Sequence, residues 1–227
     1  MDPFVLQLQE LCRAEPTRAK WVFVPGHGVG HTLGERLALG GTSWANLRFT
    51  PPLELALGMA APFLVEAGTD PAPDGLGPAL VTRLLLDLPS ATPAYFRRLA
   101  EQPRMADVLW AALRELRMAG LGAADLKPEA FASPDKHAEL RALLLACEAH
   151  LGVRRLADAA DVFQEALRRV EVCPIRADDV TLELPGHLWS PIERRFLDAL
   201  PGRRVTPRWL EPAALERPRR LADLAAR

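Results

Sequence analysis

The spacing of apolar residues at the start of the chain predicts a helix followed by a short buried strand. Segment 4–11 repeats apolar residues at helical spacing. It follows Asp2 and Pro3, which suit an N-cap and a first helical turn. The continuous apolar run Trp21–Val24 has the length and character of a strand that is buried on both faces. The chain therefore opens with a helix and a strand of a parallel sheet.

The next fifty residues continue this alternation of helices and strands. After a glycine-rich turn, a helix runs to Gly40 and Gly41, which stop it. Residues 45–49 predict a second strand, and an apolar helix follows, with Thr50 as its N-cap and an end near Gly68. A β-α-β-α order predicts an α/β fold with a parallel sheet covered by helices.

The pattern changes in the middle of the chain. Residues 69–78 are rich in Pro, Gly and Asp and predict a surface loop. Five segments of helical period follow, namely 79–88, 93–102, 104–120, 133–152 and 156–170. About 100 residues of helix are too many for one ordinary crossover connection, so we expect a helical insertion.

Strand character returns near the end of the chain. Residues 178–186 predict a strand, 190–200 a helix and 203–207 a short strand. We therefore expect three parts. They are residues 1–75 as the first part of the α/β core, 76–172 as the helical insertion, and 173–227 as the return to the core with a basic C-terminal segment.

Composition narrows the class of protein only a little. The 28 Lys and Arg balance 29 Asp and Glu, so net charge favours no single class of partner. No apolar run reaches the roughly 18 residues of a membrane span, and the acidic start differs from a signal peptide, so we expect a soluble, cytoplasmic protein with no membrane partner. Cys12, Cys147 and Cys173 are odd in number and lack C-x-x-C spacing, which favours buried thiols over disulfides or zinc ligands.

A glycine-rich segment, PGHGVGHT, lies where the first predicted strand gives way to a helix. Its residues are Pro25, Gly26, His27, Gly28, Val29, Gly30, His31 and Thr32. Phosphate-binding loops of the form G-x-x-x-x-G-K-S/T occupy this position, with glycines that let backbone N–H groups face the anion. Thr32 stands where such a loop has its magnesium-binding hydroxyl, but His31 replaces the lysine and Pro25 the first glycine. The alternative is an ordinary strand-to-helix turn.

The end of the strand predicted at 178–186 also indicates whether the glycine-rich segment belongs to a working phosphate site. Nucleotide-hydrolysing enzymes of this architecture hold magnesium through an acidic residue at the tip of such a strand. Here the tip is Leu184–His187, which has no acid. Strand alternation predicts that Glu183 lies on the opposite face from Leu182 and Leu184, exposed to solvent. Two parts of a hydrolysis site are degraded together, so we expect a degenerate phosphate loop and no catalytic residue.

Basic residues are the other candidates for binding. Arg203, Arg204 and Arg208, with Trp209, can contact a nucleic-acid backbone, and a solvated tail is the alternative. A second basic and aromatic group, Tyr95, Phe96, Arg97, Arg98 and Arg104, is equally consistent with an amphipathic helix. We place His27 in the loop before the helix, so its spacing from His31 does not predict a metal site. We expect no metal and no cofactor.

The order and spacing of these segments resemble a known family. WVFVPGHGVGHTLGERLA, WANLRFTPPLELA, YFRRLAEQP, LRELRMAGL, ELRALLLACEAHL and LADAADVFQEAL follow one another as in the N-terminal part of AddB-like proteins, the B subunits of ATP-dependent helicase/deoxyribonucleases. The resemblance extends from about Trp21 to Leu200. It implies a superfamily 1 helicase-like fold, that is, a P-loop NTPase-like (RecA-like) sheet with a large helical insertion, which in this family precedes a PD-(D/E)XK nuclease domain.

The resemblance also assigns positions. It puts Pro25–Thr32 at the Walker A motif, Asn46–Thr50 at the segment after the second strand and Leu184–His187 at the Walker B tip. Many members of the family have lost the catalytic residues at these positions, and this sequence conforms to that inactive type. It has no segment like the family's second helicase-like domain, nuclease motif or cysteine cluster.

Two functions are therefore expected. The resemblance implies an ATPase-inactive, helicase-like scaffold and DNA-binding domain of a DNA double-strand-break repair helicase–nuclease subunit, not catalytic by itself. Its partners are single-stranded DNA and a motor helicase–nuclease subunit. The alternative is a small P-loop enzyme that binds a nucleotide or phosphate and uses His31.

Overall fold

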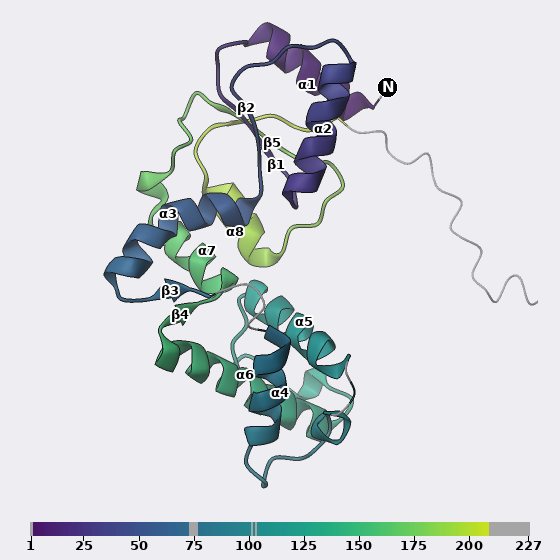
Figure 1. The fold of residues 1–227 in the computed structure, drawn as a ribbon, viewed down its shortest axis with the longest axis vertical. Coiled ribbons are helices and arrows are strands. Elements are labelled where there is room, and N and C mark those ends of the chain that lie inside the picture. Colours follow the sequence, from purple (N-terminus) through teal and green to yellow (C-terminus); the bar gives the residue numbers. More distant parts are fainter. Residues whose placement is uncertain (1, 73–76, 101, 103, 209–227) are drawn as a thin grey trace, which may run out of the picture. The chain divides into compact units, whose positions relative to one another are not determined.

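The computed structural model describes residues 2–72, 77–100, 102 and 104–208, which form two compact units (Figure 1). The sheet unit comprises Met1–Pro51, Ile175–Leu188 and Pro201–Arg227. The helical unit comprises Pro52–Pro174 and Trp189–Leu200. The helices on either side of the predicted insertion thus belong to the helical unit, and each unit has its own apolar core.

The sheet unit is built on four parallel strands in the order β2-β1-β5-β6. Their bounds are Lys20–Phe23 for β1, Leu47–Thr50 for β2, Val180–Glu183 for β5 and Arg203–Arg204 for β6. The α/β prediction and the three main predicted strands are confirmed, because β1, β2 and β5 belong to one sheet. All pairings are parallel, so these strands end at the same edge of the sheet.

Two helices share a core with this sheet. Helix α1 is Pro3–Ala14 and α2 is His27–Leu39. As predicted, Asp2 caps α1, since its carboxylate accepts a hydrogen bond from the N–H of Phe4 at 2.9 Å. The core joins fully buried residues of both helices and of two strands, including Leu8, Leu37, Val22 and Leu182.

One glycine sets how closely α2 approaches the sheet. A Cβ atom at Gly30 would lie 2.6 Å from Cβ of Phe49 on β2, which is closer than two non-bonded carbon atoms can approach. Gly28, on the same helix, has no such neighbour within 4 Å. Gly30 is therefore required for the packing of α2 against β2. In other α/β folds a glycine likewise lets a helix pack closely against a strand.

These two glycines give a matched test of the packing. We expect Gly30→Ala to lower the free energy of unfolding by about 1–3 kcal/mol, because the added methyl group forces α2 away from Phe49. Gly28→Ala should raise it by about 0.5–1 kcal/mol, because alanine is the better helix residue. Urea unfolding at equal m-value measures both changes. Equal effects of the two variants would contradict the packing role.

The helical unit contains the other six of the eight α-helices in the described residues. They are α3 Pro52–Glu66, α4 Gly77–Asp87, α5 Met105–Met118, α6 Pro134–Arg154, α7 Ala159–Arg168 and α8 Pro191–Ala199. Within the predicted loop, β3 Asp70–Pro71 pairs with β4 Leu156–Ala157 in a second parallel sheet. Thr50 was predicted to cap α3, which is wrong because Thr50 ends β2 and α3 begins at Pro52. None of the described helices is long and apolar enough to cross a membrane.

One predicted helix is absent. Residues 93–102 have an amphipathic pattern, but the described part of this segment forms only the short 3-10 helix η1, Arg97–Leu99. The cause is Glu139 of α6, whose fully buried carboxylate accepts hydrogen bonds from the N–H groups of Phe96 and Arg97. These long-range contacts bind one oxygen of the buried carboxylate and override the local helical pattern. The other oxygen, Oε1, lies 3.8 Å from the guanidinium of Arg97 and accepts no hydrogen bond from the described residues.

A network of charges links three helices of the helical unit. The guanidinium of Arg117 on α5 donates to Asp158 at 2.9 Å and to Asp161 at 2.6 Å, and lies 3.7 Å from Glu148 of α6. Asp158 also caps α7, where it forms a capping box with Asp161. Burial alone would raise the pKa of Asp158, but the hydrogen bond and charge of Arg117 hold this pKa below its ordinary value. Burial and the charge of Asp158 raise the pKa of Asp161.

The network predicts a pH-dependent stability. Asp158→Asn keeps an N-cap residue but removes the charge that binds Arg117, so it should cost about 1.5–3 kcal/mol at pH 7. Because the folded-state pKa of Asp158 is lowered, its contribution is complete above pH ~4 and is lost as the pH falls further. Urea unfolding of both proteins at pH 7 and at pH 3 tests this. An equal difference at the two pH values would contradict it.

Candidate functional site

The turn after β1 is shorter than a phosphate-binding loop. Strand β1 ends at Phe23 and α2 begins at His27, so only Val24–Gly26 lie between them. Gly26 is the N-cap, and its carbonyl accepts hydrogen bonds from the N–H groups of Val29 at 3.2 Å and Gly30 at 3.4 Å. Of the eight predicted loop residues, only Pro25 and Gly26 precede the helix. The others form its first turns, in which the N–H groups of Val29 and Gly30 already donate to the carbonyl of Gly26.

The side chains of this helical turn are also placed differently from a phosphate site. The hydroxyl of Thr32 donates to the carbonyl of Gly28 at 3.0 Å, a bond within the same helix. His27 was predicted to lie in a loop, which is wrong, because it is the first residue of α2. His27 and His31 are thus one helical turn apart and both exposed. Among the described residues, no group of three His, Cys, Asp or Glu side chains could hold a metal ion.

The tip of β5 lies beside the tip of β1. The N–H of Leu184 donates to the carbonyl of Phe23 at 3.0 Å, so the two strand ends are neighbours. Glu183 was predicted to be exposed, but its side chain is only 17% exposed and lies 3.9 Å from the guanidinium of Arg204 on β6. The acid nearest to the tip of β5 is therefore directed toward a cation of the neighbouring strand.

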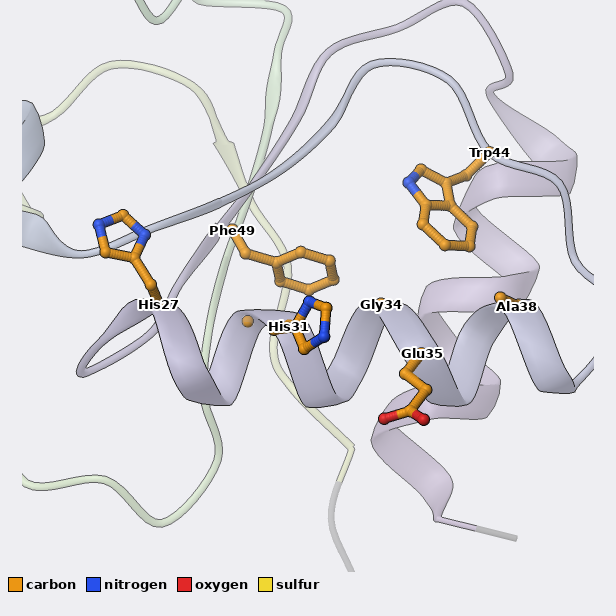
Figure 2. Close-up of a pocket in the computed structure, with 8 residues that line it drawn as sticks. His27, His31, Gly34, Glu35, Ala38, Trp44 and Phe49 are labelled. Atoms are coloured by element: carbon orange, nitrogen blue, oxygen red, sulfur yellow. The ribbon is translucent and has the colours of Figure 1, made fainter.

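A hollow of about 780 Å³ opens along the exposed side of α2. It is lined by His27, Gly30, His31, Gly34, Glu35, Ala38, Trp44 and Phe49. Figure 2 shows the rings of Phe49 and Trp44 along α2, on either side of Gly34, with Glu35 turned away from the rings. Sequence reasoning missed this hollow, because Trp44 and Phe49 come from the segment after α2 and no motif links them to the helix.

The predicted DNA-binding arginines each face an acid. Arg203 forms an ion pair with Glu15. Arg208 pairs with Glu10 at 2.7 Å, and Arg204 with Glu183 at 3.9 Å. Trp209, the fourth predicted residue, lies outside the described residues. The structure thus brings the three arginines to the sheet unit with much of their charge balanced by carboxylates.

The arginines of the second basic and aromatic group differ from one another in their surroundings. Arg97 donates to the carbonyls of Leu88 at 2.8 Å and Thr92 at 2.7 Å, and its side chain is only 19% exposed. It therefore anchors its own loop. Arg98 and Arg104 are exposed.

Two of the three cysteines are buried thiols with a raised pKa. Cys12 and Cys147 are buried, Cys173 is half-buried, and none is in a disulfide. Burial raises the pKa of Cys12, with partial opposition from the charge of Lys20. Burial and the charge of Asp158 raise the pKa of Cys147 to about 11. These two thiols are therefore protonated near neutral pH and are poor nucleophiles.

A scan against models of known protein families finds no match for this chain, and a search of curated proteins finds no similar sequence. The resemblance to helicase-like proteins therefore stays a prediction from the order of the sequence segments.

Proposed function

We propose that this chain is an ATPase-inactive, helicase-like scaffold and DNA-binding domain of a DNA double-strand-break repair helicase–nuclease subunit. The observation that carries the proposal is the start of α2 at His27, with only Val24–Gly26 between this helix and β1. A phosphate cradle needs several backbone N–H groups that face an anion, whereas here Val29 and Gly30 already donate to Gly26.

We propose a RecA-like core with a helical insertion as the finer fold class, on the order of the elements along the chain. β1 lies between β2 and β5, and α2 follows β1 directly. Residues 51–179 separate β2 from β5 and contain five of the six α-helices of the helical unit. This is the order expected when a helical segment is inserted between the Walker A and Walker B strands. A motor helicase–nuclease subunit is the partner proposed for such a scaffold.

The charge distribution is compatible with DNA contact. The side chains of Arg203, Arg204 and Arg208 are 48%, 49% and 60% exposed, although each faces a carboxylate. A guanidinium has five N–H donors, so an arginine that binds one carboxylate can also donate to a phosphate. The affinity for single-stranded DNA should therefore be modest and should fall as salt rises.

The second candidate is a small enzyme that binds a nucleotide or a phosphate. The hollow beside His27 and His31 favours it, because ligands of open α/β sheets bind near the carboxyl ends of the strands. Two measurements separate the candidates. Thermal stabilisation by magnesium-ATP supports the enzyme, and salt-sensitive binding of single-stranded DNA without nucleotide supports the scaffold.

A lysine substitution tests whether the loop lacks only its cation. We predict that His31→Lys does not create ATP hydrolysis, because neither a phosphate cradle nor a carboxylate at the tip of β5 positions the metal and the attacking water. Steady-state phosphate release with magnesium-ATP, with and without single-stranded DNA, measures this. Turnover by the wild type that Thr32→Ala reduces would overturn the scaffold proposal and favour the enzyme.

The DNA contact has its own test. Replacement of Arg203, Arg204 and Arg208 by Ala should weaken binding of single-stranded DNA and flatten its dependence on salt by about one unit of slope for each phosphate that is no longer neutralised. The control is Ala at Arg83, Arg154 and Arg168, which removes the same charge from the helical unit. Fluorescence anisotropy at several salt concentrations gives both quantities. An equal weakening of binding in the two triple variants would remove the three arginines from the proposed DNA contact.

A further inference from the structure

We propose that the hollow along α2 is a platform on which the bases of single-stranded DNA stack, with Phe49 and Trp44 as the stacking rings. The inference rests on the proposed DNA-binding function and names residues of the sheet unit that contact the bases. It concerns a surface separate from Arg203, Arg204 and Arg208, and no sequence motif indicates it.

The two rings flank a single glycine. A Cβ atom at Gly34 would lie 3.7 Å from Cε2 of Phe49 and 3.8 Å from Cζ2 of Trp44, both ordinary contact distances. Position 34 therefore lies between the rings, and only the absence of a side chain leaves the space over the helix open (Figure 2). Trp44 is 36% exposed and Phe49 is half-buried, so both rings are anchored yet accessible. Aromatic rings held in this way are what sequence-tolerant single-strand binding requires.

The hollow continues beyond Trp44. A second hollow, lined by Ala38, Gly41, Thr42, Ser43 and Trp44, shares Ala38 and Trp44 with the first. The two together follow most of α2, whose 13 residues extend about 20 Å. A surface of this length accommodates consecutive nucleotides rather than one isolated base.

In the part of the chain that the structure describes, no Lys or Arg lines either hollow, but a cation contacts Thr42, which lines the second. Nη2 of Arg13 lies 3.5 Å from the hydroxyl of Thr42, and Arg13 has no carboxylate partner among the described residues. In this it differs from Arg203, Arg204 and Arg208. Glu35 at the rim of the first hollow repels phosphate but can accept a hydrogen bond from a base amino group. We therefore place the phosphates toward Arg13 and the bases over the rings, a division of roles typical of single-strand sites.

The test uses the complete chain, a fluorescein-labelled single-stranded DNA oligonucleotide and an abasic oligonucleotide of the same length. We expect the strand with bases to bind more tightly than the abasic strand. Gly34→Leu should lower its affinity about tenfold, because the leucine occupies the space between the rings. Gly28→Leu is the matched control on the same helix, since no atom lies within 4 Å of a Cβ there. Arg13→Gln should reduce the salt slope by about one.

Trp44→Ala and Trp44→Phe provide the second pair of variants, which keeps the test valid if Gly34→Leu does not fold. The alanine variant should bind weakly and the phenylalanine variant nearly as well as the wild type, because phenylalanine preserves a stacking face. The platform is overturned if the oligonucleotide with bases and the abasic oligonucleotide bind equally well. It is also overturned if Gly34→Leu binds as well as Gly28→Leu, or if the two Trp44 variants bind equally well. Any of these results leaves DNA contact at other surfaces intact. Absence of any binding of single-stranded DNA to the wild type overturns the platform and the proposed DNA-binding function together.

Discussion

The sheet unit depends on the parallel pairing of β1 with a strand on each side. Val22 lies opposite Phe49 on β2 and opposite Leu182 on β5, although β5 comes some 160 residues later in the chain. Parallel neighbours cannot be joined by a tight turn, so the chain must cross over between each pair. One crossover contains α2, and the other contains most of the helical unit. The same pairing brings the ends of β1 and β5 together, so the residues after Phe23 and Glu183 lie at one edge of the sheet.

At that edge of the sheet, glycine has a packing role. Glycines after a strand are shared by phosphate loops and by helices that approach a sheet closely. Gly30 belongs to the second kind, because Phe49 occupies the space that a side chain would need. The same helix exposes Gly34 between two aromatic rings, so a smooth helix face packs against the sheet at one position and lines an open hollow at the next. This arrangement can present a surface to a ligand without binding phosphate in a loop.

Features set by local pattern were predicted from the sequence, and features set by distant contacts were not. The continuous apolar run at Trp21–Val24 predicted a strand because a strand buried on both faces needs apolar residues on both. At 180–184 the alternation of apolar and polar residues predicted another strand. The helical pattern of 93–102 failed because Glu139, some 40 residues away, takes the N–H groups of that segment. The beginning of α2 at His27 was missed because glycine disfavours helix. The contact with Phe49, which explains why Gly30 stands in this helix, is not visible in the sequence. The Arg208–Glu10 pair joins residues almost 200 positions apart, so no local charge pattern reveals it.

The central claim is that the N–H groups after β1 belong to a helix and do not bind phosphate. Amide NMR spectra of the ¹⁵N-labelled protein during titration with magnesium-ATP test it most directly. The account predicts no selective, saturable change in the amide signals of Gly26, Gly28 and Gly30 up to millimolar nucleotide. A saturable shift of these three signals at micromolar magnesium-ATP, abolished by Thr32→Ala, would contradict it.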